Sequence, residues 1–289
     1  MLLKFGKKSI LYATICFAVV ITFSEVYRAE FIRWVDIKYF NEGLRDSFAS
    51  IFSDEDWLTR EDLSSNLDYG WLEIADKPIL IAHALGAAGL PGSNTLTQMV
   101  SSFKKGFIFF ELDVALDSDG ILRCAHDPKN LSKYKNGDCN FQKVVKYVNR
   151  NDLFLIIDIK SDFKLTAKAI FSRVSQFDAK RLIFQLYQPD HIMVFKQFHE
   201  RKNFAGPIVT LYRSRRSVDH VLSALASSGI KVVTIPRYRL SALRKNKFTF
   251  SVLTHPVHNC SQLKEVNDFE LAGFYVTDEI FPKSQNLCD

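Results

Sequence analysis

The chain has 289 residues, of which 47% are hydrophobic and 24% are charged, and it contains 25 phenylalanines but only 12 glycines. This aromatic content excludes a disordered chain, because disordered sequences lack the apolar mass that a core requires. The formal net charge is only +6, and no zinc-finger spacing or RNA-binding aromatic pattern accompanies it, so we expect no nucleic-acid partner.

The first 24 residues have the pattern of an export signal. Lys4, Lys7 and Lys8 precede an uncharged apolar run at residues 10–23, an order typical of such signals. The run is shorter than the ~20 residues of a comfortable transmembrane helix, and no small-x-small cleavage site follows it. We predict a signal anchor at residues 1–24, with a cleaved signal peptide or a buried helix as alternatives. The catalytic domain is then expected outside the cytoplasm, membrane-anchored or exported.

Residues 25–76 are predicted to form a helical and acidic connector. Apolar residues recur at helical spacing among charged ones in segment 24–51, which indicates an amphipathic helix. Segment 53–76 is rich in acidic residues and is expected to loop over the surface. Residues 77–289 then form the main domain.

The main domain is predicted to be an α/β fold, a TIM-type (β/α)8 barrel. Eight apolar runs lie at residues 79–83, 107–113, 154–159, 182–187, 208–212, 232–236, 250–255 and 274–278. Most gaps between them hold enough residues for a helical crossover, and therefore for parallel pairing. Eight parallel strands with crossovers are the elements of such a barrel, and uninterrupted apolar runs suit strands that are buried on both faces.

One further apolar run, at residues 121–126, is predicted to form a β-hairpin arm after the second strand. The link before it is too short for a crossover but suits a hairpin turn. With a two-residue turn, Asp113 is expected opposite Cys124 and Glu111 opposite His126. Opposed residues project to one face, and positions two apart share that face. Glu111, Asp113 and His126 are therefore expected to converge.

Polar side chains at strand ends and on the hairpin predict a metal-dependent catalytic site. They are His83, Glu111, Asp113, His126, Asp158 and Lys160. Catalytic groups in barrels lie at the carboxyl-terminal end of the strands, where three carboxylates would repel one another without a cation between them. Oxygen ligands favour Mg²⁺ or Ca²⁺ over zinc. His83 and His126 are predicted to serve as base and acid around a phosphoryl group whose oxygens contact the metal and Lys160. Taken singly, each residue also fits an ordinary surface role.

An ordered set of motifs resembles the glycerophosphodiester phosphodiesterase family, in the phospholipase-C-like phosphodiesterase superfamily. The motifs are IAHALG at 81–86, SNT at 93–95, Gly106 followed by ELDV at 111–114, Asp119-Gly120, His126-Asp127, IDIK at 157–160 and GFYVTD at 273–278. The resemblance covers residues 79–282. It implies a TIM barrel that cleaves phosphodiesters with a metal ion. It also implies that a neighbouring substrate hydroxyl attacks phosphorus and releases an alcohol through a cyclic phosphate.

The resemblance also implies roles for individual residues. These are an acid/base pair (His83 and His126), three metal ligands (Glu111, Asp113 and Asp158) and two substrate contacts (Lys160 and Asn94).

The chain departs from the family pattern at three places. The usual arginine after the first histidine is replaced by Ala84, and the usual glutamate before the SNT asparagine is replaced by Ser93. The usual tryptophan near the seventh strand end is replaced by the sequence Leu-Thr-His at residues 253–255. Arg213 and Arg237, each at or just past a strand end, are candidates to supply the missing positive charge.

A basic region surrounds these two arginines. Residues 196–247 contain twelve Lys or Arg but only Glu200 and Asp219, an excess of +10, so the rest of the chain sums to −4. Such a region suits an anionic substrate or a phosphate-rich membrane surface, or is a solvated helical face.

The function predicted from these features is metal-dependent hydrolysis of a phosphodiester. The substrate is a glycerophosphodiester, a lysophospholipid or a phosphodiester-linked glycan. Two other functions stay open: a non-catalytic barrel that binds phospholipids or phosphopolymers, and a sphingomyelinase-D-like phosphotransferase. Ala84 and Ser93 favour binding without turnover, whereas the retained histidines and carboxylates favour an enzyme.

The five cysteines contain no CxxC pair, which argues against a zinc or thioredoxin-like site. Cys124 with Cys139, or Cys260 with Cys288, would form a disulfide in an oxidising compartment. The sequence alone leaves both pairings open.

Overall fold

The computed structural model describes residues 57, 67–74, 77–86, 93–127, 129, 139–245, 249–277 and 279–282. The predicted signal anchor at 1–24 and most of the predicted connector at 25–76 lie outside these residues. Among the residues that are described, no helix combines the length and the apolar character needed to cross a bilayer.

Eight parallel strands form a closed barrel. They are β1 (Ile79–Ala82), β2 (Phe109–Leu116), β4 (Phe154–Ile159), β5 (Leu182–Leu186), β6 (Ala205–Thr210), β7 (Val232–Pro236), β8 (Ser251–Val257) and β9 (Gly273–Val276). Successive strands pair, and β1 pairs with both β2 and β9, which closes the ring. Each of the eight predicted runs overlaps one of these strands, so the predicted TIM-type barrel is confirmed.

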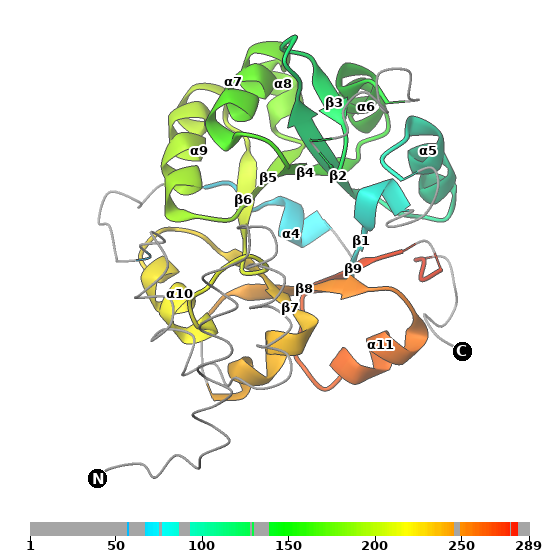
Figure 1. Cartoon of the computed structure of the whole chain (residues 1–289). Helices are drawn as coiled ribbons and strands as arrows, with labels where there is room; N and C mark the ends of the chain where they lie inside the picture. Colours follow the sequence, from blue (N-terminus) through cyan, green and yellow to red (C-terminus); the bar gives the residue numbers. More distant parts are fainter. Residues whose placement is uncertain are drawn as a thin grey trace.

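Helices connect the strands on the outside of the barrel. They are α5 (Leu96–Lys104), α6 (Phe141–Arg150), α7 (Phe163–Arg173), α8 (Gln176–Ala179), α9 (Pro189–Lys202), α10 (Val218–Leu225) and α11 (Cys260–Val266). Two 3-10 segments, η2 (His83–Gly86) and η4 (Arg237–Lys245), follow β1 and β7. Figure 1 shows α5 to α9 around one half of the barrel and α10 and α11 around the other. Side chains such as Thr95 and Ser217 cap the starts of these helices by accepting from a backbone N–H, which satisfies a donor that would otherwise lack a partner.

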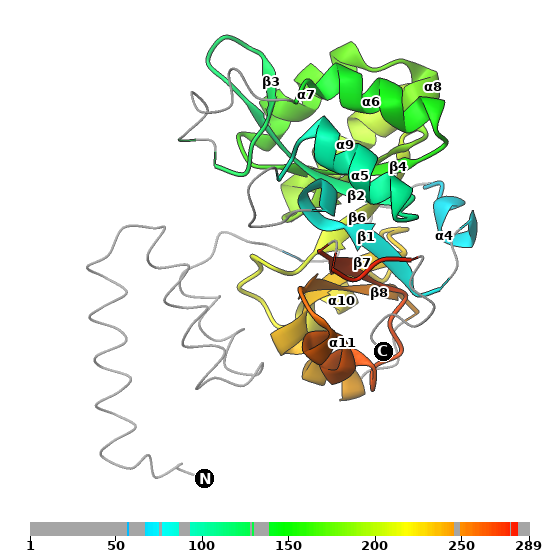
Figure 2. The ribbon, with the colours of Figure 1, turned by 90° about the vertical axis from the view of Figure 1, so that its right-hand side faces the viewer.

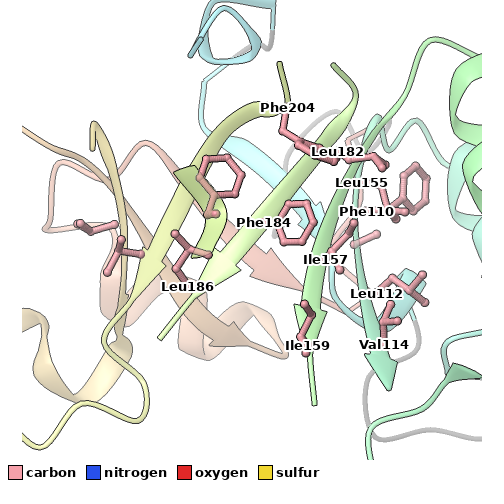
Figure 3. Packing of buried hydrophobic residues seen from close by; sticks show 14 of the residues in the cluster. Phe110, Leu112, Val114, Leu155, Ile157, Ile159, Leu182, Phe184, Leu186 and Phe204 are labelled. Carbon is pink, nitrogen blue, oxygen red and sulfur yellow. The ribbon is translucent and has the colours of Figure 1, made fainter. Parts of the chain in front are cut away.

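Alternation along the strands separates an outer core from the barrel interior. Leu112, Ile157 and Phe184 belong to the large outer cluster that packs under the helices (Figure 3). Ile156 and Ile183, each one position before an outer residue of the same strand, belong to a second, inner cluster, as does Ile81 of β1. Because side chains of a strand alternate between its faces, Glu111, Asp113 and Asp158 share the inward register.

The short helix α4 (Trp71–Ile74) closes the barrel at the end where the strands begin (Figure 2). The Trp71 indole packs 5.8 Å from the Phe109 ring and donates to Gly206 O at 3.1 Å. Tyr69 donates its hydroxyl to Pro207 O at 3.0 Å. A Cβ at Gly206 would lie 2.8 Å from Tyr69 ring atoms and from Asp68 O, so this approach requires glycine. These residues fall in the predicted connector, and the sequence analysis did not anticipate this contact.

A hairpin joins β2 to β3 (Leu122–Cys124), as predicted, but its predicted register is wrong by one residue. Cys124 pairs with Val114 instead of Asp113, so the expected opposition of Glu111 and His126 does not occur. Asp117 N donates to Ile121 O at 3.0 Å, so the turn consists of the three residues 118–120 instead of the predicted two. Gly120 has φ of +74°, the left-handed conformation that ends such loops. Figure 2 shows the hairpin extending beyond the barrel.

A disulfide links Cys124 to Cys139, with Cα atoms 5.8 Å apart. It ties the end of β3 to a residue two positions before the start of α6 and so spans the segment that carries His126. The alternative pair includes residue 288, which lies outside the described residues, although Cys260 itself is disulfide-bonded.

Removing this bridge is expected to destabilise the fold. The double variant Cys124→Ser/Cys139→Ser should lose about 3 kcal/mol of unfolding free energy, the value typical of a loop near the 15-residue separation seen here. Urea denaturation under non-reducing conditions measures this loss. The wild type, denatured in parallel with and without reductant, is the control. Equal unfolding free energies for variant and non-reduced wild type would contradict the prediction.

Candidate active site

Three buried carboxylates gather inside the barrel near the carboxyl-terminal ends of β2 and β4. Asp113 lies directly beside Asp158 in the β2–β4 register, and Glu111 is two positions earlier on β2. One oxygen from each lies within 4.8 Å of the others. The structure therefore brings together the three predicted ligands.

Among the described residues, Lys160 is the cation that contacts this cluster. Its Nζ lies 2.6 Å from Asp158 Oδ2 and 2.9 Å from Asp113 Oδ1. Burial opposes the charge, but Asp158 and Asp113 raise the pKa of Lys160 well above its usual value. One ammonium against three carboxylates leaves a formal charge of −2. Consistent with this excess, burial and the neighbouring Asp113 and Asp158 raise the pKa of Glu111.

The pKa of Asp113 is shifted in the opposite direction to that of Glu111. Burial alone would raise its pKa, but the Lys160 ammonium, together with His126 and His83, lowers it below its ordinary value. The two β2 carboxyls, two positions apart, therefore favour different protonation states.

Three buried oxygens of the cluster accept no hydrogen bond from the described residues: Glu111 Oε1, Asp113 Oδ1 and Asp158 Oδ1. Of these, Asp113 Oδ1 forms the ion pair with Lys160 at 2.9 Å, which leaves Glu111 Oε1 and Asp158 Oδ1. A buried charged oxygen without a partner is costly. Oxygen donors with excess negative charge suit a hard divalent cation, so these residues fit the predicted Mg²⁺ or Ca²⁺.

A strained turn and a buried amide donate hydrogen bonds to two further oxygens, Glu111 Oε2 and Asp113 Oδ2. Ala84 and Leu85 in η2 have φ of 50° and 63°, and this turn directs Ala84 N to Glu111 Oε2 at 2.7 Å. Asn94, with φ of 58°, donates to Asp113 Oδ2 at 2.8 Å and accepts from Asp113 N at 3.0 Å. Such backbone strain persists where the surrounding contacts fix the geometry. Asn94, predicted as a substrate contact, thus holds Asp113 in this structure.

Two residues at the end of β5 complete the surroundings of Asp158 and were missed by the sequence analysis. Tyr187 donates to Asp158 Oδ2 at 2.6 Å, and Gln185 Nε2 donates to the same oxygen at 3.1 Å. Burial and the nearby Asp158 raise the pKa of Tyr187 well above its usual value, so the phenol stays a donor. Both residues lie at inward positions at the end of β5, and this pattern could have identified them as site residues from the sequence.

The predicted histidine pair lies at the mouth, but its two members differ. His83 Nε2 lies 3.8 Å from Glu111 Oε2, and burial lowers its pKa to about 4, so the ring is neutral at pH 7. His126 is exposed, and its charge contributes to the lowered pKa values of Asp113 and His83. A third histidine, His255, lies with its Nε2 3.0 Å from His83 Nε2. From the sequence, this position was recognised only as a departure from the family pattern.

The two candidate arginines occupy different places. The Arg213 guanidinium lies 4.8 Å from the centre of the Tyr187 ring, next to the phenol that contacts Asp158. Arg237 forms an ion pair with Glu265 of α11, on the outside of the barrel. The structure therefore places Arg213, but not Arg237, beside the carboxylate cluster.

No protein-family model and no curated protein matches the chain. Solved structures do match it. A glycerophosphodiester phosphodiesterase from Parabacteroides distasonis is 17% identical, with a TM-score of 0.55, and the match covers 69% of this chain and 92% of that one. A phosphodiesterase from Oleispira antarctica, solved with its product sn-glycerol-3-phosphate, is 15% identical, with a TM-score of 0.55 and coverage of 70% and 93%. The chain has the glycerophosphodiester phosphodiesterase fold. The match covers both solved chains almost completely, so the shared fold extends over a complete barrel.

Proposed function

We propose that the chain is a divalent-cation-dependent phosphodiesterase that works at the mouth of the barrel. The observation that carries the proposal is the buried cluster of Glu111, Asp113 and Asp158, whose three carboxyl groups outnumber the ammonium groups that contact them among the described residues. A site that attracts a cation and holds a lysine and histidines beside it suits a phosphoryl group. The shared fold supports the same reaction class.

The three carboxylates would hold the cation, which when bound neutralises negative charge on phosphate oxygens. Lys160 lies between Asp113 and Asp158 and is placed to contact a phosphate oxygen beside them. Tyr187 and Asn94 keep Asp158 and Asp113 in fixed orientations through their hydrogen bonds. Fixed ligands keep the reacting group aligned, which is the main contribution of such sites to rate.

Proton transfers are assigned to His83 and His126. Cleavage needs one group to accept a proton from the attacking hydroxyl or water and another to donate to the leaving oxygen. His83 is neutral and half-buried at the carboxylates, and His126 is exposed at the same mouth. Arg213 beside Tyr187 is proposed to contact the anionic substrate, in place of the family arginine.

We propose a glycerophosphodiester, a lysophospholipid or a phosphodiester-linked glycan as the substrate. The product bound to the Oleispira antarctica phosphodiesterase, sn-glycerol-3-phosphate, supports the glycerol-containing members of this group. The disulfide between Cys124 and Cys139, and the disulfide-bonded Cys260, support a site of action in an oxidising compartment. Membrane attachment through residues 1–24 stays a prediction from the sequence.

A substrate panel tests the proposal. The purified full chain is incubated with glycerophosphocholine, lysophosphatidylcholine and a phosphodiester-linked glycan, each with Mg²⁺, Ca²⁺ or EDTA, and products are followed by ³¹P NMR. Turnover that requires a cation is expected for at least one substrate. Asp158→Asn should remove it, whereas the matched variant Asp152→Asn, at an exposed ion pair with Arg181, should keep it.

The products also separate the alternatives. A cyclic phosphate as the final product would favour the phosphotransferase. Cation-dependent binding of every substrate without conversion would favour the non-catalytic barrel and contradict the proposed function.

A further inference from the structure

His255 reaches the site by ordinary alternation along β8, because Leu253, two positions earlier, belongs to the inner cluster. The register with β7 is unbroken up to His255, which pairs with Pro236. Leu253 and Thr254 also pair in step with Gly273 and Phe274 of β9, but Val257 pairs with Val276. One extra residue therefore lies in β8 across positions 255 and 256, and Val257 belongs to the outer cluster. Extra residues of this kind are frequent near active sites. Pro256 has no N–H to contribute to the ladder, which suits this break.

The His255 ring packs against His83 at close range. The two ring centroids lie 4.3 Å apart with the planes 77° from each other, and the Nε2 atoms are 3.0 Å apart. Aromatic rings surround His255 on other sides, with Tyr212 at 5.3 Å and Tyr275 at 5.2 Å. These edge contacts limit rotation of the His255 ring.

His83 has little else to fix its orientation. Its Nδ1 is buried and has no hydrogen-bond partner among the described residues, and its Nε2 is 3.8 Å from Glu111 Oε2, beyond hydrogen-bond distance. Histidines that transfer protons are commonly oriented by a hydrogen bond at the nitrogen that does not react. In His83 the hydrogen bond is made at Nε2, the nitrogen 3.8 Å from Glu111 Oε2, and its partner is a second imidazole.

We propose that His255 is a positioning residue, which holds the His83 ring in one orientation and one tautomer through the hydrogen bond between the two Nε2 atoms. One ring must donate and the other accept, so the tautomer of His83 is coupled to the nitrogen that His255 presents to it. The proposal deepens the proposed function and rests on it for its catalytic meaning. The orientation itself is observable without turnover.

The test compares two substitutions at one position. His255→Phe keeps a ring between Tyr212 and Tyr275 but has no nitrogen, and His255→Gln keeps a polar group near the position of Nε2. Long-range ¹H–¹⁵N NMR of the full chain reports the His83 tautomer. A single tautomer is expected in the wild type, a mixture or a different tautomer in His255→Phe, and a wild-type-like spectrum in His255→Gln. His220→Phe, on α10 away from the mouth, is the control.

Kinetics on the active substrate give the second readout. His255→Phe should lower kcat by about 10²-fold, the cost of a small misplacement of a reacting group, with KM nearly unchanged. His255→Gln should recover most of the loss. Unchanged His83 nitrogen signals in a folded His255→Phe variant would overturn the proposal, as would equal kcat losses in both variants. Changed His83 signals in a protein that cleaves no phosphodiester would support the positioning role and contradict the proposed function.

Discussion

Replacing His83 with alanine is expected to lower kcat for phosphodiester cleavage by about 10²–10⁴-fold, the range typical of a lost acid or base. His83 is half-buried, neutral and 3.8 Å from Glu111, so water does not readily substitute for it. KM should change only a few-fold, because Lys160 and the carboxylate cluster remain in place to bind the phosphate. Steady-state kinetics at saturating cation measure both constants.

The double variant His83→Ala/His126→Ala separates joint from independent action. If the two histidines serve one reaction step as acid and base, the double variant should be little worse than the His83 variant alone, because groups that act as a unit lose activity non-additively. His220→Ala, outside the barrel, should leave kcat unchanged. Near-normal turnover in His83→Ala would exclude His83 from proton transfer, even for a correctly folded barrel.

Replacing Glu111 with glutamine is expected to stabilise the cation-free protein and to remove its response to cations. The substitution puts a neutral amide in place of a carboxyl whose ionised form is disfavoured, because burial, Asp113 and Asp158 raise the pKa of Glu111. Without cation, Tm should therefore rise. In the wild type, a cation at 100 times its Kd should add about 2.7 kcal/mol of stability, and this increment should disappear in the variant together with turnover.

Thermal unfolding with and without Mg²⁺ or Ca²⁺ measures the effect of Glu111→Gln. Glu265→Gln makes the same chemical change at an exposed ion pair with Arg237, so it should keep the wild-type response to cations. A Glu111→Gln protein whose Tm still rises with cation would show that the ion binds elsewhere.

The barrel and its carboxylate cluster could be predicted from the sequence because both depend on simple periodicity. Apolar runs at crossover spacing predict parallel strands, and a closed barrel brings the strand ends together. Asp113 and Asp158, far apart in the chain, lie side by side through that geometry alone. Lys160, two positions after Asp158, follows onto the same inward face.

Features that depend on one residue of register could not be predicted. The hairpin turn contains three residues because Gly120 adopts a left-handed conformation, and that single difference moves Cys124 opposite Val114. In β8 the extra residue changes the pairing of Val257; His255 itself shares the inward face with Leu253, but nothing in the sequence indicates that its ring contacts His83. Trp71 was assigned to a connector, because nothing in its local sequence marks the barrel end that it fills.

The contact from Ala84 to Glu111 uses the main chain and not a side chain. Any residue except proline has the backbone N–H that this carboxylate oxygen needs, provided that the turn through Leu85 is preserved. The hydrogen bond depends on backbone conformation, so an arginine can be absent from position 84 without loss of the hydrogen bond. Two chains can then share the same site geometry while their motifs diverge beyond sequence recognition.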